Sequence, residues 1–122
     1  MNPPGKSTTG RLLAAPAMPA RGEIFEELLR CRNVRIERIL SSDRPEPTLY
    51  DQEQDEWVCL LQGEAELSLN GERFELRAGD YVFIPAHMPH RVLHTSSNPP
   101  CIWLAVHIHH DPPLPHADQS IG

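Results

Sequence analysis

The stretch GDYVFIPAHMPHRVLH, residues 79–94, decides what class of fold the chain can adopt. Pro85 and Pro89 each lack a backbone N–H and restrict the residue before them, so a helix cannot run through the stretch. The pattern instead predicts a strand over 81–84, a proline-bounded turn over 85–89 and a second strand directly after it.

The histidines of this stretch fall into different structural positions. His87 belongs to the turn, whereas His90 begins the second strand. Because side chains alternate along a strand, His90, Val92 and His94 are expected on one face. Whether these histidines are ligands depends on what that face meets, which the rest of the chain must indicate.

Short strands and turns also fill the middle and the end of the chain. Asn70 and Gly71 between two alternating runs are the strongest short-range hairpin signal. The near-continuous apolar run over 56–62 indicates a strand buried on both faces. Further strands are predicted over 34–40, 65–69, 73–76 and 101–109. Strands of this length with turn signals between them indicate a sandwich or barrel, so the expected fold class is all-β.

The two ends of the chain have different patterns. Residues 22–30, GEIFEELLR, place apolar residues at helical spacing with acids early and an arginine last, which predicts a short helix within 21–33. Residues 1–20 are rich in small residues and proline, and are expected to form a flexible arm. Prolines prevent residues 111–122 from continuing a sheet, so they are expected to be a C-terminal tail. The barrel should therefore span 34–110.

Composition limits the function classes. A chain of 122 residues is most economically one domain. Acidic residues outnumber basic ones 17 to 11, for a net charge of −6, which argues against non-specific nucleic-acid binding. The sequence has no run of 18 apolar residues, so no membrane span is predicted. Cys31, Cys59 and Cys101 show no CxxC spacing and adjoin apolar residues, so buried free thiols in the cytoplasm are expected.

Glu56 is the first candidate for chemistry. It begins an otherwise apolar strand, where a buried carboxylate must be paired, hydrogen-bonded or bound to a cation. His90 is placed similarly after its proline turn. A carboxylate and an imidazole converging inside a small barrel would suit a divalent transition metal. The alternative is a glutamate at a strand end that faces solvent beside an unrelated histidine, and the spacing alone leaves both open.

Two motifs carry a family resemblance. In EWVCLLQG, six residues separate Glu56 from Gly63, and in GDYVFIPAHMPH, five separate Gly79 from Pro85, with His90 five positions further on. These resemble the two motifs of the cupins, small double-stranded β-helix (jelly-roll) barrels. The spacing of fifteen residues between the motifs is similar to the short spacing in compact single-domain, phosphomannose-isomerase-like cupins. The resemblance implies a cupin barrel that forms a homodimer.

The resemblance also implies a metal site, with a departure. Cupins carry two histidines six and four residues before the glutamate of the first motif, and here these positions hold Tyr50 and Gln52. Glu56 and His90 match the other two ligands. Gln52 can supply an amide oxygen, as in phosphomannose-isomerase-like cupins. The implied ligands of a divalent iron, manganese, zinc or nickel ion are therefore Gln52, Glu56 and His90.

Other residues are candidates for roles around that ion. Tyr50 and His94 are expected to act as general acid or base, and His94 or else His107 could complete the ligand set. The leading hypothesis is a metal-dependent cupin that acts on a small polar metabolite as an isomerase or epimerase, a lyase or a dioxygenase. The alternative is a metal-free cupin that binds or senses a small molecule through Tyr50, Gln52 and His90. No nucleic-acid or membrane partner is expected. A purely structural dimer module would instead have a barrel without a pocket.

Overall fold

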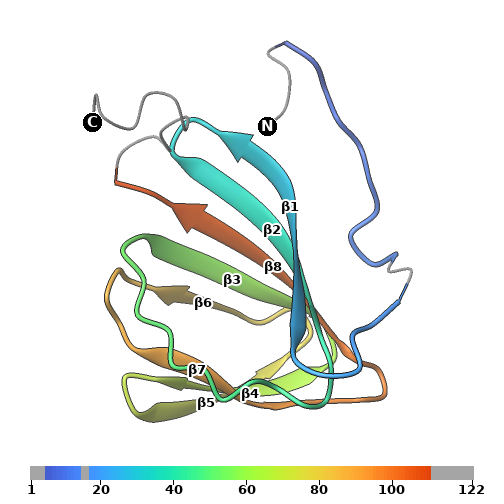
Figure 1. The fold of residues 1–122 in the computed structure, drawn as a ribbon, viewed down its shortest axis with the longest axis vertical. Coiled ribbons are helices and arrows are strands. Elements are labelled where there is room, and N and C mark those ends of the chain that lie inside the picture. The colour runs from blue at the N-terminus through green and yellow to red at the C-terminus, as the bar shows by residue number, and fades with distance from the viewer. Residues whose placement is uncertain (1–4, 15–16, 111–122) are drawn as a thin grey trace.

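Two antiparallel β-sheets face each other in this computed structural model, which describes residues 5–14 and 17–110 (Figure 1). The larger sheet has the order β1 (Glu23–Cys31), β2 (Val34–Ser41), β8 (Cys101–Ile108), β3 (Asp55–Gln62), β6 (Tyr81–Ile84). The smaller sheet has the order β5 (Glu72–Arg77), β4 (Glu64–Leu69), β7 (His90–Thr95). The described residues contain no helix, which confirms the all-β fold class.

The core fills the space between the two sheets. On β3, Val58 and Leu60 point inward and are buried, while Cys59 between them is half-buried. Trp103 of β8 and Leu67 of β4 pack into the same apolar cluster from neighbouring strands. Because β3 lies between β8 and β6, both of its edges are hydrogen-bonded and its inward face lies against the smaller sheet.

The hairpin between β4 and β5 turns where the sequence predicts. Asn70 and Gly71 have φ values of 51° and 84°, the left-handed pair that a two-residue type I′ turn requires. The turn pairs Leu69 with Glu72 and sets the register of the whole hairpin. An asparagine followed by a glycine adopts these angles with little strain.

Gly63, the last residue of the first motif, allows a close approach between segments. Its φ is +92°, and a Cβ atom there would lie 2.8 Å from both the Cys101 Sγ and the Ser96 Oγ. Either feature alone would disfavour a side chain. Together they explain why β3 ends at a glycine and how β4 begins against the segment that leads into β8.

The short helix expected within 21–33 is wrong, because residues 23–31 form strand β1 at the edge of the larger sheet. β1 pairs with β2 from Glu23 opposite Ser41 to Cys31 opposite Val34. A bulge between Glu27 and Leu29 inserts one extra residue. That insertion breaks the two-residue alternation of the strand. The apolar residues on the two sides of the bulge are therefore spaced as they would be on one face of a helix.

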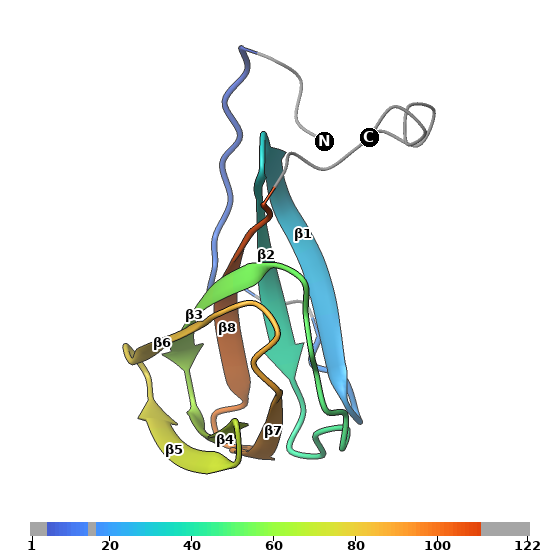
Figure 2. The same cartoon turned by 90° about the vertical axis from the view of Figure 1, so that its left-hand side faces the viewer.

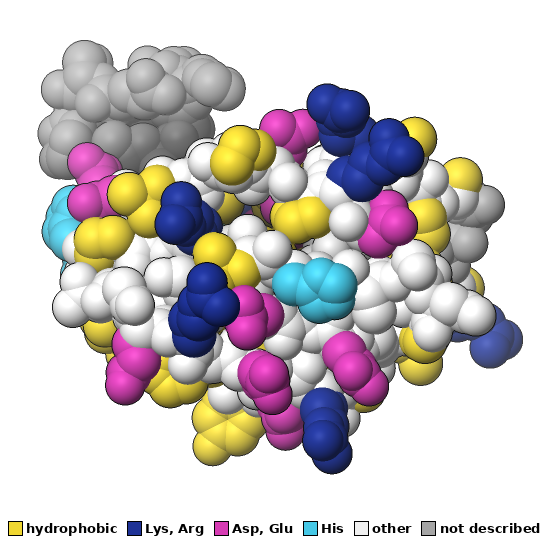
Figure 3. Space-filling view, turned by 90° about the horizontal axis from the view of Figure 1, so that it is seen from below, with side chains coloured by type: hydrophobic (Ala, Val, Ile, Leu, Met, Phe, Trp, Pro, Cys, Tyr) yellow, Lys and Arg dark blue, Asp and Glu magenta, His cyan; other side chains and the backbone are white. Residues whose placement is uncertain are grey.

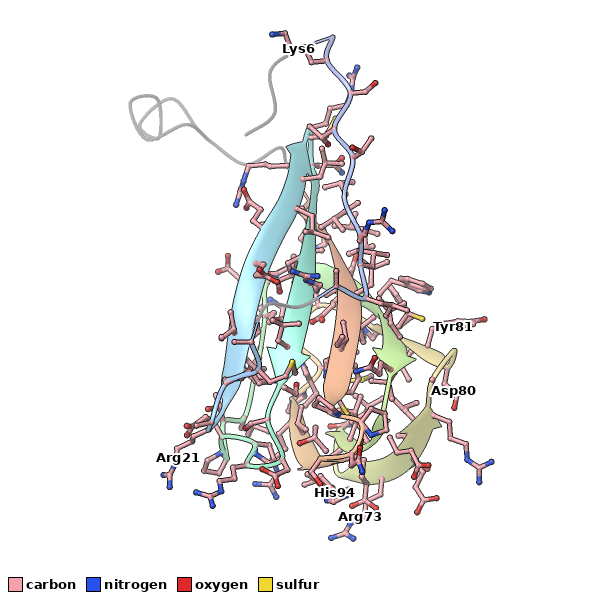
Figure 4. The ribbon with its side chains drawn as sticks, turned by 90° about the vertical axis from the view of Figure 1, so that its right-hand side faces the viewer. Lys6, Arg21, Arg73, Asp80, Tyr81 and His94 are labelled. Atoms are coloured by element: carbon pink, nitrogen blue, oxygen red, sulfur yellow. The ribbon has the colours of Figure 1, made fainter. Side chains whose placement is uncertain are left out.

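The N-terminal segment lies along the outer face of the larger sheet (Figures 2 and 4). Arg38 of β2 donates hydrogen bonds to the backbone carbonyls of Arg11, Leu12 and Ala14, and it also pairs with Glu26 at 2.7 Å. One guanidinium group therefore attaches this arm to the barrel. The tail expected over 111–122 lies outside the described residues.

On the face shown in Figure 3, acidic and basic side chains are interspersed. The described part of the chain contains no helix that could cross a membrane. The three cysteines are free; Cys101 is buried and Cys59 half-buried, but Cys31 is exposed, so the expectation of a buried thiol is wrong there.

Candidate functional site

A cavity of about 70 Å³ lies between the two sheets. Its apolar walls include Val58, Leu67, Ile84, Val92 and Trp103, and its polar groups are Glu23, Glu37, Tyr50, Gln52, Glu56, His90 and His107. Four of the five predicted site residues therefore lie together, and His94 does not. The volume suits a small organic molecule or several waters.

Three predicted metal ligands meet on one side of this cavity. Glu56 is the second residue of β3 and His90 is the first of β7, and their exposed fractions are only 6% and 9%. The amide Nε2 of Gln52 donates a hydrogen bond to Glu56 Oε1 at 2.9 Å. The prediction that Glu56 is buried and needs a partner is thus confirmed, whereas the alternative of a solvent-facing glutamate is wrong.

The orientation of His90 leaves one ring nitrogen for a ligand. Its Nδ1 lies 2.9 Å from the carbonyl oxygen of Met88, and because a carbonyl only accepts, this nitrogen carries the hydrogen. In the neutral ring, Nε2 then has a lone pair, and it faces Glu56 Oε1 at 3.8 Å. Two electron-rich atoms facing each other in a buried site favour a positively charged group between them.

Backbone pairing brings Tyr50 to this site. Tyr50 and His90 exchange two backbone hydrogen bonds of 2.8 and 3.0 Å, and their rings stack with centroids 5.5 Å apart. Burial raises the pKa of the Tyr50 phenol, and the negative charges of Glu23 and Glu56 raise it further. The phenol therefore stays protonated and can donate a hydrogen bond into the cavity.

The turn at 85–89 holds the loop that carries Gln52. The backbone N–H of His87 donates to the Gln52 carbonyl at 2.7 Å, and that of Ala86 donates to Asp55 Oδ1 at 2.8 Å. The His87 side chain is exposed and lies 2.9 Å from Asp51. His87 has a φ of 63° and shapes the turn, which is the position the sequence predicted for it.

His94 lies away from the cavity, so the expectation that it shares a face with His90 is wrong. In the pairing of β4 with β7, Glu66 lies opposite His94 and the next residue, Leu67, lies opposite Val92. Strand β7 therefore has one extra residue between Val92 and His94. This bulge reverses the alternation. His94 is exposed and lies at the lower end of the molecule (Figure 4).

A second buried pair, formed by Glu37 and His107, lines the same cavity. His107 Nε2 lies 2.8 Å from Glu37 Oε1, while Gln54 Nε2 lies 3.1 Å from His107 Nδ1. Arg35 donates to the other Glu37 oxygen at 2.7 Å. Burial raises the pKa of the Glu37 carboxyl, but the hydrogen bond and charge of His107 and the charge of Arg35 outweigh it, so the pKa lies below its ordinary value.

Glu23 is a further cavity residue that the sequence analysis did not identify. It begins β1, opposite Ser41 of β2, and its Oε2 accepts a hydrogen bond from the Ser41 hydroxyl at 2.9 Å. Burial raises the pKa of the Glu23 carboxyl, and the neighbouring charges of Glu56 and Glu37 add to the rise. The helix predicted for this segment gave no reason to place Glu23 in the site, because only strand pairing with β2 directs its side chain inward.

The donor set decides whether a metal ion fits. No three His, Cys, Asp or Glu side chains of the described residues are grouped closely enough to hold one by themselves. Glu56 and His90 present a carboxylate and an imidazole lone pair to one space, which fits a divalent ion. Gln52 now turns its amide nitrogen toward Glu56, so its coordination would require a half-turn of the amide group.

The fold and this cavity define a jelly-roll barrel protein. The chain belongs to the cupin family, since its residues 39–107 match the cupin domain. No curated protein matches the chain. Glu23 and Glu37 precede the matched range, so two of the cavity carboxyls come from sequence outside it.

Solved structures agree with this assignment. A putative mannose-6-phosphate isomerase from Ralstonia eutropha JMP134 is 38% identical, with a TM-score of 0.77 over 84% of this chain and 99% of that one. An RmlC-like cupin from Desulfovibrio desulfuricans is 18% identical, with a TM-score of 0.72 over 84% of this chain and 97% of that one. FeII HppE is 17% identical, with a TM-score of 0.62 over 71% of this chain and 50% of that one.

Proposed function

We propose that this cupin is a metal-dependent protein that acts on a small polar molecule. The observation that carries the proposal is the approach of His90 Nε2 to Glu56 Oε1 at 3.8 Å, with the Nδ1 of His90 committed to the Met88 carbonyl. This pairing of a metal-binding histidine with a backbone carbonyl is the arrangement that fixes ring orientation at metal sites. His90, Glu56 and Gln52 would hold the ion.

A bound divalent ion would supply Lewis-acid polarisation of an oxygen on the substrate. The chain supplies the surroundings of the reaction. Tyr50 offers a protonated hydroxyl, and the apolar walls formed by residues such as Ile84 and Val92 limit the access of water. These features support isomerase or epimerase, lyase or dioxygenase chemistry. The name of the 38% identical structure favours the first of these.

Metal content of purified, tag-free protein tests the proposal. We expect about one equivalent of iron, manganese, zinc or nickel in the wild type and its loss in His90→Ala and Glu56→Gln. The matched control is His94→Ala, which removes an exposed histidine of the same strand and should keep the metal. Protein that takes up no stoichiometric metal after incubation with each of the four ions would overturn the proposal.

A metal-free binding or sensing role is the second candidate, because Gln52 and Glu56 already hydrogen-bond each other at 2.9 Å. In that role Tyr50, Gln52 and His90 would contact a small molecule directly. Thermal-shift screening of metabolites in the presence of a chelator separates the two candidates. Stabilisation that persists without metal, and that Gln52→Ala removes, would favour the binding role.

A further inference from the structure

The polar groups of the cavity differ in charge from those that bind phosphate or carboxylate ligands. Glu23, Glu37 and Glu56 supply three carboxyl groups, and no lysine or arginine is among the lining residues of the described chain. Arg35 bonds the outer oxygen of Glu37 but does not line the cavity. Even with a divalent ion bound at Glu56, the charge of Glu23 has no cationic partner among the described residues.

Two oxygen atoms in this cavity are available to a ligand. Glu23 accepts one hydrogen bond, from Ser41 to its Oε2, and its Oε1 has no partner within the described residues. Glu56 is more than nine-tenths buried, accepts one hydrogen bond at its Oε1 from Gln52, and its Oε2 likewise has no hydrogen-bond partner within the described residues. Neither oxygen is sealed from solvent, because His109 Nε2 is the only fully buried side-chain polar atom without a partner among the described residues. A ligand that enters the cavity can therefore reach both oxygens and donate a hydrogen bond to either one.

Aromatic rings line the same space. Tyr50, Trp103 and Phe25 contribute to the cavity wall, and the indole N–H of Trp103 donates to the Ser41 hydroxyl that in turn donates to Glu23. This chain of hydrogen bonds links the Glu23 carboxylate to the indole N–H through the Ser41 hydroxyl. A carboxylate beside aromatic faces is a recognition pattern for organic cations.

We propose that Glu23 recognises a cationic nitrogen, so that the ligand of this cavity is a small amine rather than a phosphate or carboxylate. The proposal rests on the proposed function only in that a small molecule enters the cavity. A phosphorylated sugar, which the name of the Ralstonia protein suggests for that relative, would bring its negative charge against Glu23 and Glu37 without a basic side chain to receive it.

Nuclear magnetic resonance offers an internal control, because the chain has two tryptophans. Trp103 lines the cavity, whereas Trp57 stacks on Tyr81 at 5.6 Å and is not a lining residue. The ¹⁵N-labelled full chain would be titrated at pH 7.5 with 3-aminopropan-1-ol, with its uncharged counterpart propane-1,3-diol, and with mannose 6-phosphate. We expect the amine alone to shift the indole signal of Trp103 and to leave that of Trp57 unchanged.

Glu23→Gln tests the residue itself. It keeps an oxygen acceptor for Ser41 and removes the charge, so we expect amine affinity to fall roughly tenfold or more, as for a lost charge-assisted hydrogen bond. Glu27→Gln, an exposed residue of the same strand, is the control and should leave binding unchanged. Equal shifts with the diol, preferential shifts with the phosphate, or unchanged amine affinity in Glu23→Gln would overturn the proposal.

Repeating the titration with and without a chelator separates this proposal from the proposed function. Amine selectivity that depends on Glu23 and persists in the chelator supports the present proposal, even where the protein takes up no stoichiometric metal and the metal proposal fails. Stoichiometric metal at His90 and Glu56 without any preference for the amine gives the opposite result. A retained melting temperature and dispersed spectrum of Glu23→Gln would show that the variant is folded.

Discussion

Two carboxyl groups of the cavity respond to their surroundings in opposite ways. The pKa of Glu23 is raised by burial and by nearby carboxylates, whereas that of Glu37 is lowered because His107 and Arg35 outweigh its burial. An ionised Glu23 therefore reduces the stability of the folded chain at neutral pH, while an ionised Glu37 adds to it. In the same cavity, the fold therefore disfavours the ionised form of Glu23 and favours the ionised form of Glu37.

The pH dependence of stability tests this difference at Glu23. Because its folded pKa lies above the unfolded value, its penalty is full above the folded pKa and absent below the unfolded value of 4.5. Glu23→Gln should raise the melting temperature at pH 8 by on the order of a few degrees and leave it unchanged at pH 4. Calorimetry at both pH values, each against wild type, measures it. A variant that melts lower at pH 8 would contradict the raised pKa.

The Glu37–His107 pair makes a second residue-scale prediction. His107 is 3% exposed and lies 2.8 Å from Glu37, so His107→Ala leaves one oxygen of a buried carboxylate without its partner, with only Arg35 still bonded to the other oxygen, and opens a cavity. We expect the free energy of unfolding to fall by about 3 kcal/mol. The exposed His94→Ala should change it by less than about 0.5 kcal/mol. Urea unfolding of both variants makes the comparison, and equal losses would contradict the structural role of His107.

At the scale of single elements, Gly63 separates two physical effects that usually occur together. Gly63 and Gly71 both have positive φ, but a Cβ at Gly63 would clash with Cys101 and Ser96, whereas one at Gly71 meets open space. Gly71→Ala should therefore cost about 1 kcal/mol of backbone strain, and Gly63→Ala clearly more than about 2 kcal/mol. Chemical denaturation measures both losses. Similar losses would show that the contact with β8 contributes nothing.

The strands show what local sequence can and cannot predict. The β6 strand, the proline turn and the Asn70–Gly71 hairpin follow from proline chemistry and two-residue alternation, and the structure has them where they were predicted. Strand β1 and the position of His94 were predicted wrongly, and each lies beside a bulge. A bulge shifts every later side chain to the other face, and no local pattern in this chain announces it.

At the scale of the whole molecule, the cavity combines a family motif with additional sequence. Tyr50, Gln52, Glu56 and His90 could be predicted because they stand at motif positions of a known family. Glu23 could not, because it depends on how β1 pairs with β2 before the range that matches the cupin domain. The homodimer and the cytoplasmic location stay predictions from the sequence.

We propose above all that one divalent cation is shared by Glu56 and His90, which the fold brings together from distant parts of the chain. Diffraction from crystals soaked in Zn²⁺ or Mn²⁺, collected at the metal absorption edge, tests it most directly. We predict an anomalous peak in the cavity about 2.0–2.3 Å from His90 Nε2 and from a Glu56 oxygen. A cavity without such a peak, in crystals whose surface histidines bind the same metal, would contradict it.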